Sequence, residues 1–261
     1  MNSKKFIKLY PNAKINLGLL IKGKRPDGYH LLETLFLPVP DLRDELKIRG
    51  QKEDGCSLEV EGIVLDGNPE DNLCYKAYQL LKAEVPDLPG VNLKLKKKIP
   101  AGAGLGGGSS DAAATLSGIN QLFGLGLSPE KLASIGEKLG ADVPFFIFNK
   151  PLIARGIGTD FESYELPHNF TIKLVTPPIH SSTIAAYKAL DATQFDPSRD
   201  LKNLLALPKD SWRDVLPNDL EVPVFEMYPE LVKIKQSLYD EGAFYAAMSG
   251  SGSAVFGLFT S

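Results

Sequence analysis

Glycine dominates one short segment of the chain, IPAGAGLGGGSSDAAA, which runs from Ile99 to Ala114. Five of the seven residues from Gly102 to Gly108 are glycine, and the alanine-rich run that follows favours a helix. A helix N-terminus offers free backbone N–H groups and the positive end of the helix dipole, and glycine lets an anion approach the backbone closely. The pattern therefore indicates a phosphate-binding loop between a strand and a helix.

Other glycine-rich loops fit this segment less well. The spacing Gly102-x-Gly104-x-x-Gly107 matches the dinucleotide-binding fingerprint, but that fingerprint follows a buried and almost continuously apolar strand. Here the preceding segment, VNLKLKKKIP, alternates apolar residues with lysines, which predicts a half-exposed strand. No Gly-Lys-Ser/Thr closes the run, so it is not a Walker-A loop. A flexible linker is the structural alternative, and the immediate start of a helix favours the phosphate cradle.

Three polar motifs could do chemistry or serve structure. Ser109 and Ser110 stand where a helix N-cap is expected, so their hydroxyls could cap the helix, bind phosphate, or do both. Asp142, in GADVPFF, precedes an apolar run, where an aspartate usually caps a helix or ends a turn. Lys14, in NAKINL, lies in a predicted strand, where a lysine normally points to solvent. Taken alone, these patterns leave both kinds of role open.

Two further turns have a chemical and a structural interpretation. RPDGYH predicts a Pro-Asp-Gly turn that delivers Tyr29 and His30 into a strand, either to bind a ligand or, for Tyr29, to pack in the core. The segment from Ser249 to Ser253 predicts a tight turn between two strands, which taken alone is a simple hairpin turn.

The elements that must position these residues form two sets. With 261 residues, of which 43% are hydrophobic and 23% charged, the chain is globular and long enough for two domains. The first half is rich in short strands, and helices are expected over residues 71–84, 109–123 and 129–139, the last capped by Ser128. A second set follows: FTIKLVTP as a strand, SSTIAAYKAL and PELVKIKQSLYDEG as helices, and AFYAAMSGSGSAVFGLF as strand, turn and strand. We therefore expect domains at residues 1–160 and 161–261.

Charge and cysteine content narrow the class of protein. A net charge of −3 argues against nucleic acid or an anionic membrane as the main partner. No apolar run is long enough for a signal peptide or a membrane span. Cys56 and Cys74 lack the spacing of a zinc site and are expected to be reduced thiols. These features are typical of a cytoplasmic enzyme.

The motifs together resemble a known family. PAGAGLGGGSSDAA resembles the phosphate-binding motif of the superfamily of galactokinase, homoserine kinase, mevalonate kinase and phosphomevalonate kinase. With PNAKINLGLLIKGKRPDGYHLLET, GADVPFFIFNKPLIARGIG and MSGSGSAVFGLF, the match is closer to the 4-diphosphocytidyl-2-C-methyl-D-erythritol kinases within it. The resemblance spans residues 11–259 and is specific, because the sibling kinases share the glycine loop but neither RPDGYH nor ADVPFF.

This resemblance implies a fold and a reaction. The fold would be two-domain α+β, with an N-terminal ribosomal-protein-S5-domain-2-like domain, a C-terminal ferredoxin-like α/β sandwich and a cleft between them. The reaction would transfer the γ-phosphoryl group of ATP to the 2-hydroxyl of 4-diphosphocytidyl-2-C-methyl-D-erythritol, in the non-mevalonate route to isoprenoids. Mg²⁺ is expected with the triphosphate, without a dedicated protein ligand, and the partner is this small cytidine diphosphate substrate rather than a nucleic acid or membrane.

The resemblance also implies roles for individual residues. Asp142 would be the catalytic base and Lys14 its cationic partner. Asn16 would bind the methylerythritol end of the substrate, while Tyr29, His30 and Tyr187 would bind the cytosine. The ATP-binding residues would be Pro100, Ala101, Gly102, Ala103, Gly104, Leu105, Gly106, Gly107, Gly108, Ser109 and Ser110.

Two alternatives remain at this point. A sibling small-molecule kinase, acting on homoserine or mevalonate, would share the glycine loop. A catalytically silent nucleotide-binding protein would keep the fold alone, although the presence of both Lys14 and Asp142 argues against it. The oligomeric state is not indicated by any pattern in the sequence.

Overall fold

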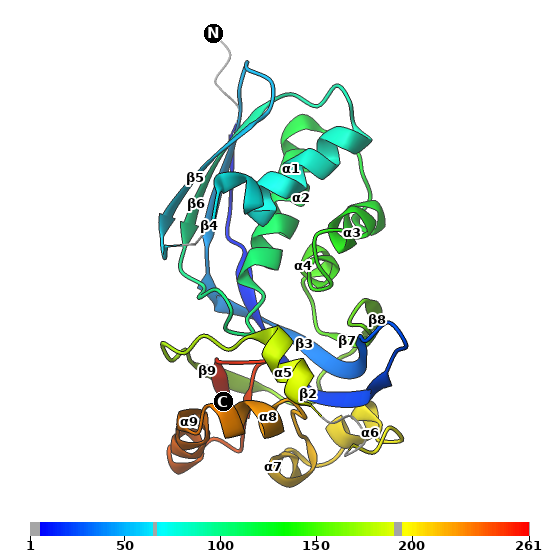
Figure 1. Ribbon diagram of the computed structural model, residues 1–261, viewed down its shortest axis with the longest axis vertical. Helices are drawn as coiled ribbons and strands as arrows, with labels where there is room; N and C mark the ends of the chain where they lie inside the picture. Colours follow the sequence, from blue (N-terminus) through cyan, green and yellow to red (C-terminus); the bar gives the residue numbers. More distant parts are fainter. Residues whose placement is uncertain (1–5, 65–66, 191–194, 261) are drawn as a thin grey trace. The chain divides into compact units, whose positions relative to one another are not determined.

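The computed structural model describes residues 6–64, 67–190 and 195–260 (Figure 1). The first five residues, part of the stretch in which no signal peptide is expected, lie outside the described residues. Contacts divide the chain into two discontinuous compact units. The first unit comprises Met1–Ala13, Val39–Ala101 and Gly106–Asn149, and the second comprises Lys14–Pro38, Gly102–Leu105 and Lys150–Ser261.

These units differ from the single boundary near residue 160 that the sequence suggests. The difference arises because two long strands, β2 (Asn12–Lys24) and β3 (His30–Arg43), have residues in both units. The glycine loop is likewise divided, since Gly102–Leu105 cluster with the second unit and the residues on either side with the first. The assignment of function to residues 1–160 and 161–261 stays a prediction.

A four-stranded sheet forms the first unit's framework. Its strand order is β1-β4-β6-β5, with β5 parallel to β6 and the other pairs antiparallel. The strands are β1 (Phe6–Leu9), β4 (Glu45–Gly50), β5 (Cys56–Gly62) and β6 (Val91–Lys97). In β6 the apolar residues Val91, Leu93 and Leu95 are buried and alternate with exposed or half-buried residues, so the predicted half-exposed strand is confirmed.

Helices cover one face of this sheet (Figure 1). They are η1 (Pro69–Asp71), α1 (Leu73–Glu84), α2 (Gly107–Phe123), α3 (Pro129–Glu137) and α4 (Val143–Phe148). The three helices predicted from sequence are confirmed, and Ser128 caps α3 by accepting from the backbone N–H of Lys131 at 3.2 Å. Gly118 lets α2 approach the sheet, because a Cβ there would lie 2.6 Å from side-chain carbons of both Ile48 and Leu9.

Two sheets belong wholly or mainly to the second unit. In the first, β2 and β3 continue through β7 (Leu152–Gly156) to β8 (Asp160–Ser163) in the order β2-β3-β7-β8. The other is antiparallel in the order β10-β11-β9, and its strands are β9 (Phe170–Val175), β10 (Tyr245–Met248) and β11 (Val255–Thr260). The predicted strand, turn and strand at the end of the chain are thereby confirmed.

The helices of the second unit comprise two that the sequence predicts and others that it does not. They are α5 (Thr183–Ala189), α6 (Leu201–Leu205), η3 (Lys209–Ser211), α7 (Trp212–Val215), α8 (Glu221–Met227) and α9 (Glu230–Asp240). Helices α5 and α9 are confirmed, and Ser182 caps α5 through the Ala185 N–H at 3.2 Å. The short helices α6 and α7 depend on tertiary packing, because segments of that length are not stable alone. The fully buried Trp212 ring, whose N–H donates to Leu207 O at 3.1 Å, anchors α7.

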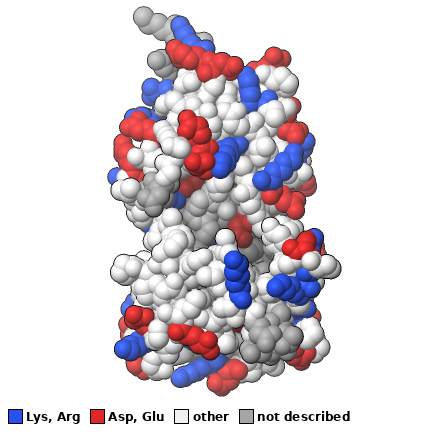
Figure 2. Space-filling model, viewed as in Figure 1, with Lys and Arg blue, Asp and Glu red and all other residues white. Residues whose placement is uncertain are grey.

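The surface and the thiols agree with a globular protein of low net charge. On the face shown in Figure 2, basic and acidic side chains are interspersed and neither sign forms a continuous patch. Within the described part of the chain, no helix has the length and apolar character needed to cross a bilayer. Both cysteines are free thiols, and burial raises the pKa of Cys56 to about 12.

Candidate active site

The N-terminus of α2 has the features of an anion site. The helix begins at Gly107, after Gly106 in a left-handed conformation with φ of 69°. No side chain caps this end, and Ser110 N–H makes the first backbone bond, to Gly106 O at 2.9 Å. The preceding N–H groups of the first turn therefore lack an intrahelical acceptor and point toward the positive end of the dipole. Ser109 lies inside this turn, so neither serine is the N-cap.

Gly107 and Gly108 lack side chains for different reasons. A Cβ on Gly107 would lie 2.8 Å from Ile99 Cγ2 and 3.2 Å from Lys97 Nζ, so protein packing requires glycine there. At Gly108 a Cβ would meet only Leu73 Cδ1, at an ordinary 3.5 Å. Since protein packing leaves room at Gly108, its missing side chain fits the close approach of a ligand to the backbone.

Gly104 is required by contact with the turn from Ser249 to Ser253. Its φ is 74°, and a Cβ there would lie 1.9 Å from Ser249 O. Ser249 Oγ donates to Gly104 O at 2.9 Å, and Ala254 N–H donates to Ala103 O at 3.1 Å. Within the second unit, the turn is therefore more than a hairpin connection, because it supports the Gly102–Leu105 part of the glycine loop.

Lys14 is buried, so the expectation that a strand lysine points to solvent is wrong here. Only 4% of the residue is exposed, and Nζ donates to Asn16 Oδ1 at 2.7 Å and lies 4.9 Å from the centre of the Phe36 ring. Asn16 Nδ2 in turn donates to Thr34 Oγ1 at 3.1 Å. The backbone N–H of Lys14 donates to Leu105 O at 3.0 Å, which brings the lysine and asparagine beside the second unit's part of the glycine loop.

Asp142 lies in the first unit, at the N-cap position of α4. Its side chain makes no capping hydrogen bond, so the structural alternative of a helix cap is not realised. Two residues earlier, a Cβ on Gly140 would lie 3.8 Å from Ser109 Oγ, which places the Asp142 loop next to the first turn of α2. Because Lys14 belongs to the second unit, its predicted pairing with Asp142 stays a prediction.

The predicted cytosine-binding residues lie in the second unit, and two of them touch. The rings of His30 and Tyr187 are stacked, with centroids 5.2 Å apart and planes at 29°. His30 is buried, and its Nε2 has no hydrogen-bond partner among the described residues. Burial and the nearby Lys24 charge lower the pKa of His30, which favours neutral imidazole. Tyr29 is 65% exposed, so the alternative that it packs in the core is wrong.

A buried charge cluster escaped the sequence analysis. Lys97 donates to Asp111 Oδ2 at 2.7 Å and also pairs with Asp44, and all three side chains are at most 3% exposed. Burial raises the pKa of Asp111 to about 8, because the carboxylate is desolvated more than Lys97 compensates. Burial would lower the pKa of Lys97, but the two carboxylates outweigh it and hold that pKa above its ordinary value. The signal was present: Lys97 continues the series 91, 93, 95 on the buried face of β6.

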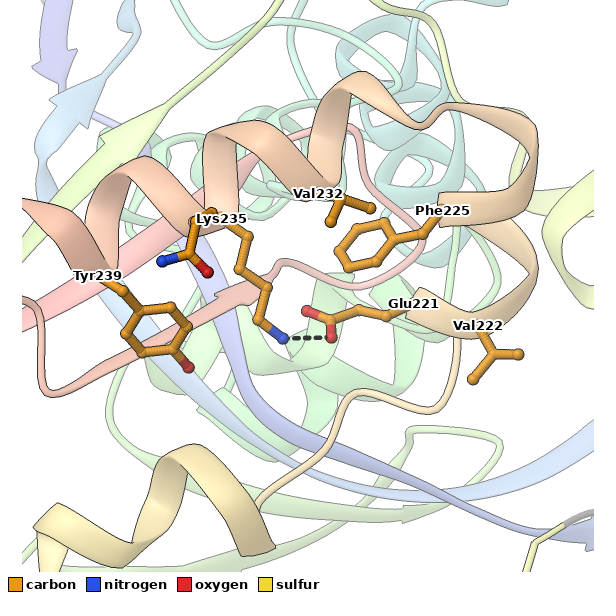
Figure 3. A pocket seen from close by; sticks show the side chains of 7 residues that line it. Glu221, Val222, Phe225, Val232, Lys235 and Tyr239 are labelled. Atoms are coloured by element: carbon orange, nitrogen blue, oxygen red, sulfur yellow. Dashed lines mark hydrogen bonds and ion pairs between the residues drawn. The ribbon is translucent and has the colours of Figure 1, made fainter.

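A pocket of about 400 Å³ between α8 and α9 lies apart from these residues (Figure 3). It contains none of the predicted site residues and is lined by Glu221, Val222, Phe225, Val232, Lys235, Gln236 and Tyr239. Glu221 pairs with Lys235 at 2.6 Å and accepts from Met248 N–H at 2.7 Å. The ion pair therefore ties the two helices to the end of β10 and has a structural role.

Comparison with known proteins identifies the family. Residues 72–150 match the GHMP kinases N terminal domain and residues 186–261 match the GHMP kinases C terminal domain. The 4-diphosphocytidyl-2-C-methyl-D-erythritol kinase of Bacteroides fragilis (strain YCH46) is 47% identical over 254 residues, covering 96% of this chain and 91% of its own. The corresponding kinase of Azobacteroides pseudotrichonymphae genomovar. CFP2 is 47% identical over 251 residues, covering 96% and 92%.

Solved structures agree with this assignment. A crystal structure of 4-(cytidine 5'-diphospho)-2C-methyl-D-erythritol kinase matches with a TM-score of 0.82 and 34% identity, covering 97% of this chain and 90% of that one. Homoserine kinase from Cytophaga hutchinsonii ATCC 33406 matches with a TM-score of 0.73 at 19% identity, covering 100% and 87%, which shows a shared fold alone. The predicted two-domain α+β fold is confirmed, and the chain belongs to the GHMP kinases, in the family of 4-diphosphocytidyl-2-C-methyl-D-erythritol kinases.

Proposed function

We propose that the chain catalyses ATP-dependent phosphorylation of the 2-hydroxyl of 4-diphosphocytidyl-2-C-methyl-D-erythritol, in the non-mevalonate route to isoprenoid precursors. The observation that carries this proposal is the 47% identity, over 96% of the chain, to a kinase named for that substrate. The uncapped α2 N-terminus supports it, because phosphoryl transfer depends chiefly on positioning and charge stabilisation of the phosphates.

The triphosphate is held by residues Pro100 to Ser110. Backbone N–H groups in the first turn of α2 donate to phosphate oxygens, and the open side of Gly108 admits the ligand to the backbone. The hydroxyls of Ser109 and Ser110 add donors at the same end of the helix. Mg²⁺ accompanying ATP would neutralise phosphate charge, and no dedicated protein ligand is assigned to it.

Asp142 accepts the proton of the substrate hydroxyl. As the new oxygen–phosphorus bond forms, the bond to the β-phosphate oxygen breaks, and ADP leaves with that electron pair. The Lys14 ammonium offsets negative charge on the transferring phosphoryl group. The hydrogen bond from Lys14 Nζ to Asn16 Oδ1, at 2.7 Å, supports this role because it fixes the lysine head group within β2.

The cytosine ring is bound by Tyr29, His30 and Tyr187. An exposed Tyr29 ring offers a stacking surface, and stacking alone tolerates any base. Selectivity needs a hydrogen bond to the base edge, and His30 Nε2, buried and without a partner among the described residues, suits that task. The contact between His30 and Tyr187 supports a role for Tyr187 in orienting the imidazole. Asn16 binds near the methylerythritol end.

The enzyme acts on a small molecule in the cytoplasm. The interspersed surface charges in Figure 2 and the net charge of −3 support a small substrate rather than a nucleic acid as the partner.

Steady-state kinetics with a panel of alcohols tests the proposal. Purified enzyme with saturating ATP and Mg²⁺ is assayed with 4-diphosphocytidyl-2-C-methyl-D-erythritol, homoserine and mevalonate, following ADP release and, by ³¹P NMR, the position of the new phosphate. We expect the cytidine substrate to have the highest kcat/KM by far. A higher kcat/KM for homoserine or mevalonate would identify a sibling kinase, and negligible turnover of all three would favour a silent nucleotide-binding protein.

A further inference from the structure

The buried cluster of Asp44, Lys97 and Asp111 joins the strand that precedes the glycine loop to the helix that follows it. Lys97 is the last residue of β6, and Asp111 lies one turn into α2. The ammonium of Lys97 bridges the two carboxyl groups, donating to Asp111 Oδ2 at 2.7 Å and to Asp44 Oδ2. Asp44 is the single residue between β3 and β4, and β4 lies beside both β6 and α2 in the first unit (Figure 1). The cluster therefore links β6 and α2 to the junction of β3 and β4.

Asp44 also holds the backbone at the loop's entrance. Its Oδ1 accepts from the N–H of Ile99 at 2.9 Å and from the N–H of Lys98. The backbone N–H of Asp44 donates to Pro11 O at 2.8 Å, which anchors the aspartate itself. These bonds fix the two residues that immediately precede the ATP-binding segment.

The same cluster lies beside the start of α2. A Cβ on Gly107 would lie 3.2 Å from Lys97 Nζ, so the lysine head group packs directly beneath the first turn of the helix. The Asp111 Oδ1 atom is buried and has no hydrogen-bond partner among the described residues, while its Oδ2 atom accepts from Lys97 Nζ at 2.7 Å. Charges this deeply buried cost several kcal/mol each unless paired, and a shared cluster makes the pairing specific in position.

We propose that Asp44, Lys97 and Asp111 are positioning residues for ATP, which hold the two ends of the glycine loop at the separation that the triphosphate requires. This inference rests on the proposed function, because it assumes that the loop binds ATP. All three side chains are at most 3% exposed. They act through the backbone of Lys98, Ile99 and the first turn of α2.

Two substitutions of Asp111 test this inference. Asp111→Leu removes the anchor on α2 but leaves the Lys97–Asp44 pair intact, so no buried charge loses its last partner. Asp111→Asn is the conservative variant, since its amide oxygen can still accept from Lys97 and its NH₂ group occupies the site of the unpartnered oxygen. We expect the Kd for ATP, measured by calorimetry, to rise about tenfold in Asp111→Leu and to stay near wild type in Asp111→Asn. The kcat at saturating ATP and the KM of the alcohol should stay within about twofold.

A matched control separates positioning from general loss of stability. Asp219 in the second unit is also a buried carboxylate, which accepts from Ile21 N–H at 2.7 Å and pairs with Arg199 at 2.5 Å. Asp219→Leu should lower the melting temperature without changing the Kd for ATP. Wild-type affinity from folded Asp111→Leu, or equal weakening in the asparagine variant or in Asp219→Leu, would overturn the inference. If wild type itself fails to bind ATP, the proposed function fails instead.

Discussion

Replacement of Asp142 by asparagine tests catalysis separately from folding. Asp142 stands at the N-cap of α4 but makes no capping hydrogen bond, so the nearly isosteric Asp142→Asn breaks no cap. Loss of a general base typically slows a reaction by about 10² to 10⁴-fold, which corresponds to about 3 to 5 kcal/mol of activation free energy. We therefore expect kcat to fall by that factor while the melting temperature and the Kd for ATP stay nearly unchanged.

The matched control is a serine that does cap a helix in the same unit. Ser128 accepts from the Lys131 N–H at 3.2 Å at the start of α3. Ser128→Ala should cost about 1 kcal/mol of stability, or about 2 to 4 °C in melting temperature, and leave kcat unchanged. The assays are ADP release at saturating substrates, calorimetric titration with ATP, and thermal unfolding. An Asp142→Asn enzyme with wild-type kcat refutes the assignment of the base, and one with a large loss of stability refutes the structural reasoning.

Three further predictions follow from other contacts. Gly104→Ala should unfold at a lower temperature, because its Cβ would lie 1.9 Å from Ser249 O. Gly108→Ala should keep its stability and bind ATP about tenfold more weakly. Thermal unfolding and calorimetry distinguish the two variants, and equal ATP affinity for Gly108→Ala and wild type argues against the phosphate-binding loop. Ser249→Ala loses the bond to Gly104 O and should raise the Kd for ATP about fivefold, with the alcohol KM unchanged as the check. Burial and the Lys24 charge lower the pKa of His30 from its ordinary value of 6.5. As the pH falls, the unfolded state therefore binds a proton before the folded state does, and the free energy of unfolding decreases below about pH 6.5. His30→Asn should weaken this pH dependence of the unfolding free energy, and an unchanged pH profile counts against the shift.

Local signals allowed much of the site to be predicted from sequence. Glycines followed by an alanine-rich helix have few alternative structures, and α2 starts two residues before the predicted position because Gly106, rather than a serine, ends the loop. Ser128 and Ser182 both cap the helices that their sequence context predicts. These features depend on neighbours within four residues along the chain, which is the range that sequence patterns report reliably.

Features that depend on distant residues were not predicted. Lys14 is buried in the polar surroundings of Asn16, which a strand pattern alone does not indicate. Asp44 and Asp111 are 53 and 14 residues from Lys97, and only the fold shows that all three charges meet. The discontinuous units arise from the length of β2 and β3, since a single cut in sequence cannot describe strands with residues in both units.

We propose that the first turn of α2 binds the triphosphate while Asp142 faces the alcohol. A crystal structure of the enzyme with a non-hydrolysable ATP analogue and 4-diphosphocytidyl-2-C-methyl-D-erythritol tests it most directly. We expect phosphate oxygens about 2.7 to 3.2 Å from backbone nitrogens of Gly107 to Ser109, and the 2-hydroxyl within hydrogen-bond distance of the Asp142 carboxylate. A triphosphate bound elsewhere, or an Asp142 side chain directed away from that hydroxyl, would contradict it.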